Sequence, residues 1–207
     1  MAPDREPATR ELRQLLREPA PKPVEIARLL DAMTHPERVG AVRALGRAEQ
    51  RRLYEAVEGF AALRLVHLVP ADRRALETVR HFGRNTLPAF TLFEKRFARP
   101  TGADPERPDR LYGYNHSPYP VVPLLTGPGY FVARENDRGE VLVDYRLLPE
   151  ERPPGWPPIR RNDRGTPRLV FGFMVDTVRR VSEHVSIGSA ARRGRDLDSY
   201  FVLCREA

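Results

Sequence analysis

The sequence predicts an α+β protein, with an N-terminal helical region followed by a curved, mostly antiparallel β-sheet that tends toward a small barrel. Two patterns predict this order of elements. Between residues 26 and 33, apolar residues recur three and four positions apart, which is typical of one face of an amphipathic helix. Between residues 141 and 147, every second residue is apolar, which is typical of a strand with one buried face.

The composition is that of a globular protein. A chain of 207 residues, 41% of them hydrophobic, is long enough to bury one sizeable core. No apolar stretch approaches the roughly 18 residues that a membrane span requires, and no secretory signal is visible at residues 1–7. Because Cys204 is the only cysteine, no internal disulfide can form, and we expect the protein to be cytoplasmic.

The net charge of +7 is distributed unevenly. Residues 1–99 hold 19 basic against 13 acidic residues, whereas the remainder holds 16 against 15. Lys22 and Lys95 are the only lysines, and arginine supplies the other 33 positive charges. This bias is typical of a GC-rich genome, and arginine enrichment alone supports nucleic-acid binding only weakly.

Three regions are expected along the chain. Residues 1–22, closed by prolines, are expected to form a flexible leader, and residues 23–99 a helical region in which Thr34 begins a T-x-x-E capping box. Two of its helices are expected between residues 71 and 99, with apolar faces formed by Leu76, Val79 and Phe82 and by Phe90, Phe93 and Phe97. The turn-rich segment 100–110 leads to an antiparallel β domain, residues 111–207, which can pack as one unit with the helices.

The β domain is expected to contain strands separated by one hairpin and one long loop. Residues 130–135 are extended, and residues 136–139 form a hairpin loop with glycine where a positive φ is expected. A proline-rich loop follows at 149–167. Inward faces are then expected from Leu169, Phe171, Phe173 and Val175, from Val181, Val185 and Ile187, and from Phe201 and Leu203.

Residues from about 130 to 205 resemble lipocalin-like barrels, and more narrowly a bacterial lipocalin-like domain of unknown function known for a GXWXG motif. The similar stretches are GEVLVDYRLLP at 139–149, DTVRRV at 176–181 and SYFVLCR at 199–205. The GXWXG motif itself is absent, since the one tryptophan, Trp156, lies in Gly-Trp-Pro-Pro. The resemblance implies a small, curved antiparallel sheet that encloses an apolar ligand.

Glu183 and His184 are the candidate catalytic residues. Odd-numbered positions from Val181 to Ile187 are apolar except Glu183, so alternation points this carboxylate inward, where an apolar pocket would raise its pKa. Alternatively, Glu183 lies near a sheet edge and pairs with an arginine. His184 lies on the opposite face of this strand. If that face, rather than the apolar one, points into the pocket, His184 replaces Glu183 as the candidate base. Asp176 is expected to cap a turn.

Further candidate ligand-binding residues come from aromatic segments. Residues 112–119 place three tyrosines, an asparagine and a histidine close together, which suits either a pocket rim, with Tyr114 and His116, or ordinary irregular structure. Trp156 either belongs to a lid over a pocket or attaches the 149–167 loop to the body of the protein. On the expected strands, Tyr145, Phe171 and Phe173 complete the candidate lining.

No sequence motif indicates a metal or a cofactor. The five histidines show neither HxH nor HxxxH spacing, and the single cysteine offers no cluster. The phosphate-binding motifs GxxxxGK[ST] and GxGxxG are absent, as is the GxSxG of serine hydrolases. We therefore expect no cofactor and no metal.

Three functions remain open at this point. The first is binding of a small apolar or amphipathic molecule between the sheet, the helices and the 149–167 loop, oriented by Tyr145, Glu183 or His184. The second is an acid–base enzyme, such as an isomerase, cyclase or lyase, that uses the same pocket; it requires a second ionisable group within hydrogen-bond reach. The third is nucleic-acid or acidic-partner binding by residues 73–99, which requires their basic side chains on one exposed face. Arginines paired with Glu77 and Glu94 would contradict it.

Overall fold

The computed structural model describes residues 7–119 and 126–207, and within them it shows an α+β fold. The helices are α1 Pro7–Arg17, α2 Pro23–Ala32, α3 His35–Ala44, α4 Arg47–Ala56, α5 Leu65–Leu68 and α7 Pro167–Val170. The strands are β1 Val79–Asn85, β2 Leu92–Ala98, β3 Leu111–His116, β4 Tyr130–Glu135, β5 Val141–Asp144, β6 Met174–Arg180, β7 Val185–Arg192 and β8 Arg195–Arg205.

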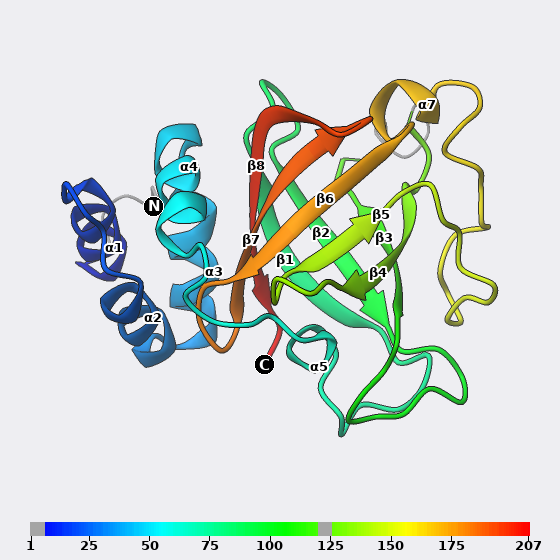
Figure 1. The fold of residues 1–207 in the computed structure, drawn as a ribbon, viewed down its shortest axis with the longest axis horizontal. Helices are drawn as coiled ribbons and strands as arrows, with labels where there is room; N and C mark the ends of the chain where they lie inside the picture. The colour runs from blue at the N-terminus through cyan, green and yellow to red at the C-terminus, as the bar shows by residue number, and fades with distance from the viewer. Residues whose placement is uncertain (1–6, 120–125) are drawn as a thin grey trace.

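The strands of the described chain form one closed antiparallel barrel (Figure 1). Each strand pairs with the next along the chain, and β8 returns to pair with β1, so the sheet has no free edge. The register brings Val79 opposite Phe97, and then Gly113 opposite both Phe97 and Phe131. These residues share the inward face, because side chains alternate across a strand. The barrel architecture agrees with the lipocalin-like expectation, but it begins at β1 rather than near residue 130.

Helices α1–α4 form a layer on one side of the barrel (Figure 1). Their apolar faces meet the outer faces of β7 and β8 in one core, where Leu30, Leu53, Ile187 and Val202 are fully buried. The capping box at the start of α3 is confirmed, since the amide of Thr34 donates to a carboxylate oxygen of Glu37 over 2.8 Å. This core fixes which face of β7 and β8 points away from the barrel interior.

The two ends of the barrel differ (Figure 1). At one end, Leu65 and Leu68 of α5 belong to the same core as the inward residues Val79, Phe97 and Val141, so this end is closed. At the other end lie the hairpins joining β1 to β2 and β7 to β8, together with α7. The α7 end is therefore the end opposite the one that α5 closes.

The 149–167 loop lies on the outside of the barrel. Trp156 is buried against Tyr114 and Tyr130, on the outer faces of β3 and β4, with ring centroids 4.8 and 6.2 Å away. Its indole nitrogen donates to the hydroxyl of Thr78 over 2.7 Å. The loop therefore covers the outer wall, and the interpretation that Trp156 attaches it to the body of the protein is the one that the structure supports.

The helices expected between residues 71 and 99 are wrong, because this segment contains β1 and β2. The inward residues of β1 are Val79, His81 and Gly83, so a histidine and a glycine conceal the alternation. The outward Phe82 then completes a misleading helical spacing with Val79. Residues 100–110 consequently connect two strands of the barrel, β2 and β3, rather than a helix and a strand.

Two smaller expectations also require correction. Within the expected leader, Pro7–Arg17 form α1, whose Leu12 and Leu16 are fully buried; residues 1–6 lie outside the described part. The inward strand expected from Leu169 to Val175 is wrong, because residues 167–170 form α7 and β6 begins at Met174. The proline at the first position of α7 favours a helix start there.

Candidate functional site

Four polar side chains from different strands meet inside the barrel, and we call them the interior cluster. Its members are Lys95 of β2, Asn115 of β3, Tyr145 just after β5, and Asp176 of β6. Register explains the meeting, because Lys95 lies opposite Asn115, and Asp176 lies opposite Val143, two residues before Tyr145. The side chains of Lys95 and Asp176 are only 2% and 3% exposed.

The hydrogen bonds of the interior cluster converge on the hydroxyl of Tyr145. The Lys95 ammonium donates to this oxygen, to Asn115 Oδ1 at 3.1 Å and to Asp176 Oδ2 at 3.3 Å. The Tyr145 hydroxyl lies 3.2 Å from Asp176 Oδ2 and accepts from Asn115 Nδ2 over 3.0 Å. The second carboxylate oxygen, Asp176 Oδ1, is buried and has no partner among the described residues. It is an unused acceptor inside the barrel.

Aromatic rings surround the ammonium of Lys95. Its nitrogen lies 4.7 Å from the centroid of Phe201 and 4.9 Å from those of Phe131 and Tyr145. Two of these rings occupy space opposite glycines: a Cβ at Gly113 would lie 2.3 Å from Phe131, and a Cβ at Gly188 2.2 Å from Phe201. The rings of Phe131 and Phe201 stabilise the cation through their negative faces, whereas Tyr145 contacts it through its hydroxyl.

Burial dominates the titration of the interior cluster. It lowers the pKa of Lys95 and raises the pKa of Asp176, and in both cases the charge of the partner opposes the shift. Burial, together with the nearby Asp176 charge, raises the pKa of Tyr145 well above its ordinary value. The cluster is thus a set of coupled proton donors and acceptors held in an apolar surrounding, an arrangement typical of functional sites.

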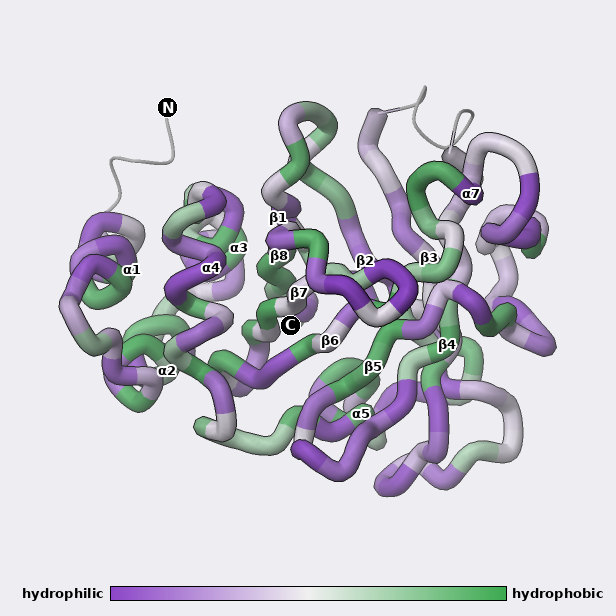
Figure 2. Tube along the Cα trace, turned by 45° about the horizontal axis from the view of Figure 1, so that its top comes forward, coloured by the Kyte–Doolittle hydropathy of each residue, from purple (hydrophilic) through white to green (hydrophobic). Residues whose placement is uncertain are grey.

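The rim of the barrel at the α7 end exposes large apolar side chains. All the large hydrophobic residues that are exposed in the described chain, except Val24, lie at this end: Leu87, Phe90, Leu147, Leu169, Phe173 and Leu197. Leu169 of α7 is 74% exposed. Figure 2 shows the hydrophobic turn of α7 standing at this rim. Exposed large apolar side chains gathered in one region are more typical of a contact surface than single scattered ones.

Two of the sequence-predicted residues meet at the interior cluster. Tyr145 belongs to it, and Phe171 stacks on the Tyr145 ring with centroids 5.3 Å apart and planes at 16°. Phe171 is only partly buried, as are Phe93 and Met174, which pack against the same core. These three side chains lie between the interior cluster and the rim. Phe173 instead is exposed on the outside, beneath the guanidinium of Arg193.

The other predicted residues lie elsewhere. Tyr114 and Trp156 pack together on the outer wall, and the ring of His116 contacts Tyr114 at the end of β3. Glu183 is not on an inward-facing strand: it lies in the turn between β6 and β7, where its side chain is 50% exposed. It pairs there with Arg180 at 2.8 Å and Arg205 at 3.5 Å, as the alternative interpretation predicted.

His184 and Asp176 also differ from expectation. His184 lies in the same turn as Glu183, and its Nδ1 is 3.2 Å from the guanidinium of Arg205. Asp176 caps no turn, because it lies within β6 and faces the interior. Sequence reasoning missed Lys95 as well. The signal that could have found it is the spacing Phe93–Lys95–Phe97, in which one of two lysines occupies an inward position between two aromatic residues.

The basic residues of segment 73–99 do not form one exposed face. Arg73 pairs with Glu77 at 3.1 Å, and Arg80 pairs with Glu94 at 2.8 Å. Lys95 is inside the barrel, and Arg99 is buried with its guanidinium on backbone carbonyls. The arrangement that nucleic-acid binding required is therefore contradicted.

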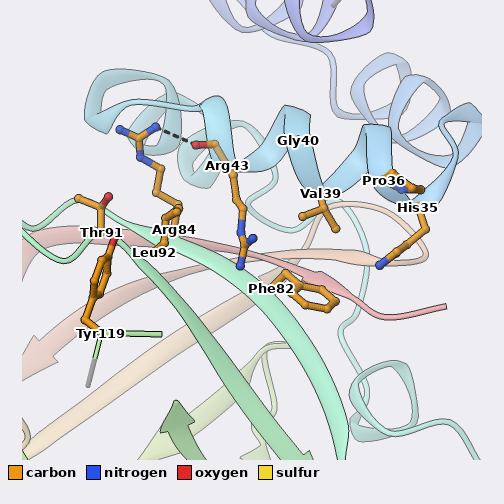
Figure 3. A pocket seen from close by; sticks show the side chains of 10 residues that line it. All are labelled: His35, Pro36, Val39, Gly40, Arg43, Phe82, Arg84, Thr91, Leu92 and Tyr119. Atoms are coloured by element: carbon orange, nitrogen blue, oxygen red, sulfur yellow. Dashed lines mark hydrogen bonds between the residues drawn. The ribbon is translucent and has the colours of Figure 1, made fainter. Parts of the chain in front are cut away.

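A groove of about 700 Å³ lies outside the barrel, between α3 and the outer face of the β1–β2 hairpin (Figure 3). It is lined by His35, Pro36, Val39, Gly40, Arg43, Phe82, Arg84, Thr91, Leu92 and Tyr119. The groove is separate from the interior cluster, since Phe82 and Arg84 alternate with the inward residues of β1.

Within residues 7–119 and 126–207, no group of three or more potential ligands among His, Cys, Asp and Glu could hold a metal ion. None of the helices there combines the length and the apolar character needed to cross a bilayer. Comparisons with protein-family models, with curated proteins and with solved structures found no match.

Proposed function

We propose that this protein binds a small amphipathic molecule inside the barrel, with its polar end at the interior cluster and its apolar part directed toward the rim. The observation that carries the proposal is the buried pair Lys95–Asp176 with the unpartnered oxygen Asp176 Oδ1. A buried ion pair is costly, and well-packed apolar residues in its place are often equally stable or more so. Its presence in an apolar barrel is explained if it recognises a polar group.

The side chains around the interior cluster support the proposed orientation of the ligand, with its apolar part toward the rim. Phe93, Phe171 and Met174 are partly buried, and they pack against the core cluster that includes Tyr145. Phe171 covers Tyr145 and follows the short helix α7, which packs few side chains into the core, since none of its residues is buried. A ligand would occupy the barrel by displacing Phe171 from Tyr145. Closed barrels of eight strands are wide enough to hold one small ligand.

The test is native mass spectrometry of freshly purified protein, followed by organic extraction of any bound molecule. Lys95→Met alone leaves a buried carboxylate without its partner and should destabilise the fold by about 3–5 kcal/mol. The informative variant is therefore Lys95→Met with Asp176→Leu, which removes both charges. We expect this double variant to fold with a stability near that of the wild type. Its mass spectrum should lack the additional mass of the bound molecule.

Glu183→Gln is the matched control, because it removes an ion-paired carboxylate from an exposed turn outside the barrel. It should retain the bound molecule at wild-type occupancy. A doubly substituted protein that still carries the same molecule would contradict the proposal, and so would a wild-type protein that releases nothing and shows no saturable uptake of amphiphiles.

A second candidate is an acid–base enzyme that uses the interior cluster. The requirement for a second ionisable group is met here, although not by Glu183, because Tyr145 lies within hydrogen-bond distance of both Asp176 and Lys95. Asp176 can then accept a proton from a bound substrate while Tyr145 donates one. Incubating the protein with the identified molecule, followed by the same extraction, separates the two candidates. A binding protein returns the molecule unchanged, whereas an enzyme also yields a reaction product, which Asp176→Asn protein should not form.

A further inference from the structure

The groove between α3 and the β1–β2 hairpin carries two guanidinium groups without a balancing charge. Among the described residues, neither Arg43 nor Arg84 forms an ion pair with a carboxylate. Nearby arginines are balanced, since Arg80 and Arg96 share the carboxylate of Glu94 at 2.8 and 2.9 Å. The unbalanced cations are therefore a property of this groove rather than of the whole face.

The two arginines approach the groove from opposite walls (Figure 3). Arg43 extends from α3 toward the ring of Phe82, with its guanidinium carbon 5.4 Å from the ring centroid. Arg84 rises from β1 and donates to the backbone carbonyl of Arg43 over 2.7 Å, which leaves its other nitrogens available. Both side chains line the groove.

Two buried nitrogen atoms of groove-lining residues have no hydrogen-bond partner among the described residues. They are Nε of Arg43 and Nδ1 of His35, whose ring lies 5.6 Å from that of Phe82. Buried polar atoms are satisfied in most native structures, so each unsatisfied one requires an explanation. Burial, opposed by the charge of Glu94, lowers the pKa of Arg43 from its ordinary value, which agrees with a cation lacking a close counter-charge.

We propose that this groove binds a small organic anion, in which a carboxylate or phosphate is attached to a flat apolar body. The oxyanion would lie between Arg43 and Arg84, because a guanidinium presents a planar fork of donors that matches these groups. The apolar body would lie on Val39, Leu92 and Phe82. The volume of about 700 Å³ is sufficient for such a molecule. The proposal is independent of ligand binding inside the barrel.

The test is a titration of the full-length protein with benzoate and with phenyl phosphate, followed by saturation-transfer NMR. Benzyl alcohol, which has the same ring without the charge, serves as the neutral probe. Both anions share the required chemistry, and at least one should bind saturably and at least about tenfold more tightly than benzyl alcohol. The ranking of the two anions identifies the preferred acid.

Three variants locate the binding. Arg43→Met and Arg84→Met should each weaken binding of the anion at least about tenfold. Arg51→Met, which removes an exposed, ion-paired arginine from α4, should change it less than about twofold. Arg43→Lys keeps the positive charge but loses the planar fork of donors, so this variant should bind the anion with intermediate affinity. It also leaves Arg84 in place, so the hydrogen bond from Arg84 to the end of α3 is kept. Equal binding of benzyl alcohol, equal losses in Arg51→Met, or no saturable binding would each overturn the proposal.

Discussion

His81 is a single residue whose burial links the stability of the barrel to pH. It faces the closed end, where its Nε2 lies 2.9 Å from the carbonyl of Leu68 and its ring contacts Phe97 edge-on. Burial lowers its pKa to about 3, so the folded protein holds the imidazole neutral. The unfolded chain takes up a proton near pH 6.5, the ordinary value. Acid therefore favours the unfolded chain.

The contribution of neutral His81 is fully present above about pH 6.5 and is lost as the pH falls toward 3. Between these values the free energy of unfolding should decrease by about 1.4 kcal/mol per pH unit from this residue alone. His81→Gln keeps a donor for Leu68 but cannot titrate, so its stability should depend less on pH. Urea unfolding at pH 7 and pH 5 measures this difference.

The matched control for His81 is His184→Gln. His184 lies in the half-exposed turn between β6 and β7, so its replacement should change the pH dependence much less. If His81→Gln loses stability with acid as steeply as the wild type, then His81 is not the group responsible.

At the scale of elements, aromatic rings of one strand pack directly against glycines of the neighbouring strand. Gly188 of β7 lies directly opposite Phe201 of β8, and a Cβ at Gly188 would lie 2.2 Å from that ring. Gly188→Ala should therefore destabilise the protein by about 1–3 kcal/mol. In the double variant with Phe201→Leu, the loss should be smaller than the sum of the single losses, because the clash is removed. Urea denaturation of the four proteins measures this coupling.

Gly113 provides the comparison for Gly188. A Cβ there would lie 2.3 Å from the ring of Phe131 but also 2.7 Å from the backbone oxygen of Arg96, which cannot move aside. Phe131→Leu should therefore rescue Gly113→Ala less than Phe201→Leu rescues Gly188→Ala. Additive losses at Gly188 would show that contact with the Phe201 ring is not the source of the loss.

The sequence predicted β5, whose inward residues are apolar, but not β1, whose inward residues include a histidine and a glycine. Val141, Val143 and Tyr145 give β5 a clear alternation, and the strand was predicted there. In β1 the inward residues include His81 and Gly83, so neighbouring apolar residues suggested a helix. The α+β class was correct, but the barrel contains two more strands in the segment 71–99 than expected.

The same cause explains why the interior cluster was mostly missed. Tyr145 and Phe171 were predicted as ligand-binding residues because they are aromatic residues in an apolar pattern. Lys95 was expected within the helices of residues 71–99, and Asp176 at a turn, because single-sequence patterns place charged side chains outside. Only the closure of the sheet brings β2 and β6, far apart in the sequence, to opposite sides of one interior.

For the whole molecule, the central question is whether the helical layer and the barrel unfold together. The division into a helical region and a β domain stays a prediction. The outer faces of β7 and β8 supply Ile187, Val202 and Cys204 to the core that α1–α4 complete. Detaching the helices would expose these side chains while the barrel remained closed. We expect one cooperative unit, because the strands bury apolar residues on both faces.

Cys204 reports directly on this cooperativity. Its thiol is fully buried beneath the helical layer, and burial raises its pKa to about 11. At pH 8 only about one folded molecule in a thousand would carry the reactive thiolate, so labelling requires opening. If the protein is one unit, iodoacetamide labelling and far-ultraviolet circular dichroism should change at the same urea concentration. Labelling at clearly lower urea, while the strand signal persists, would show that the helices detach first and that the chain has two separable regions.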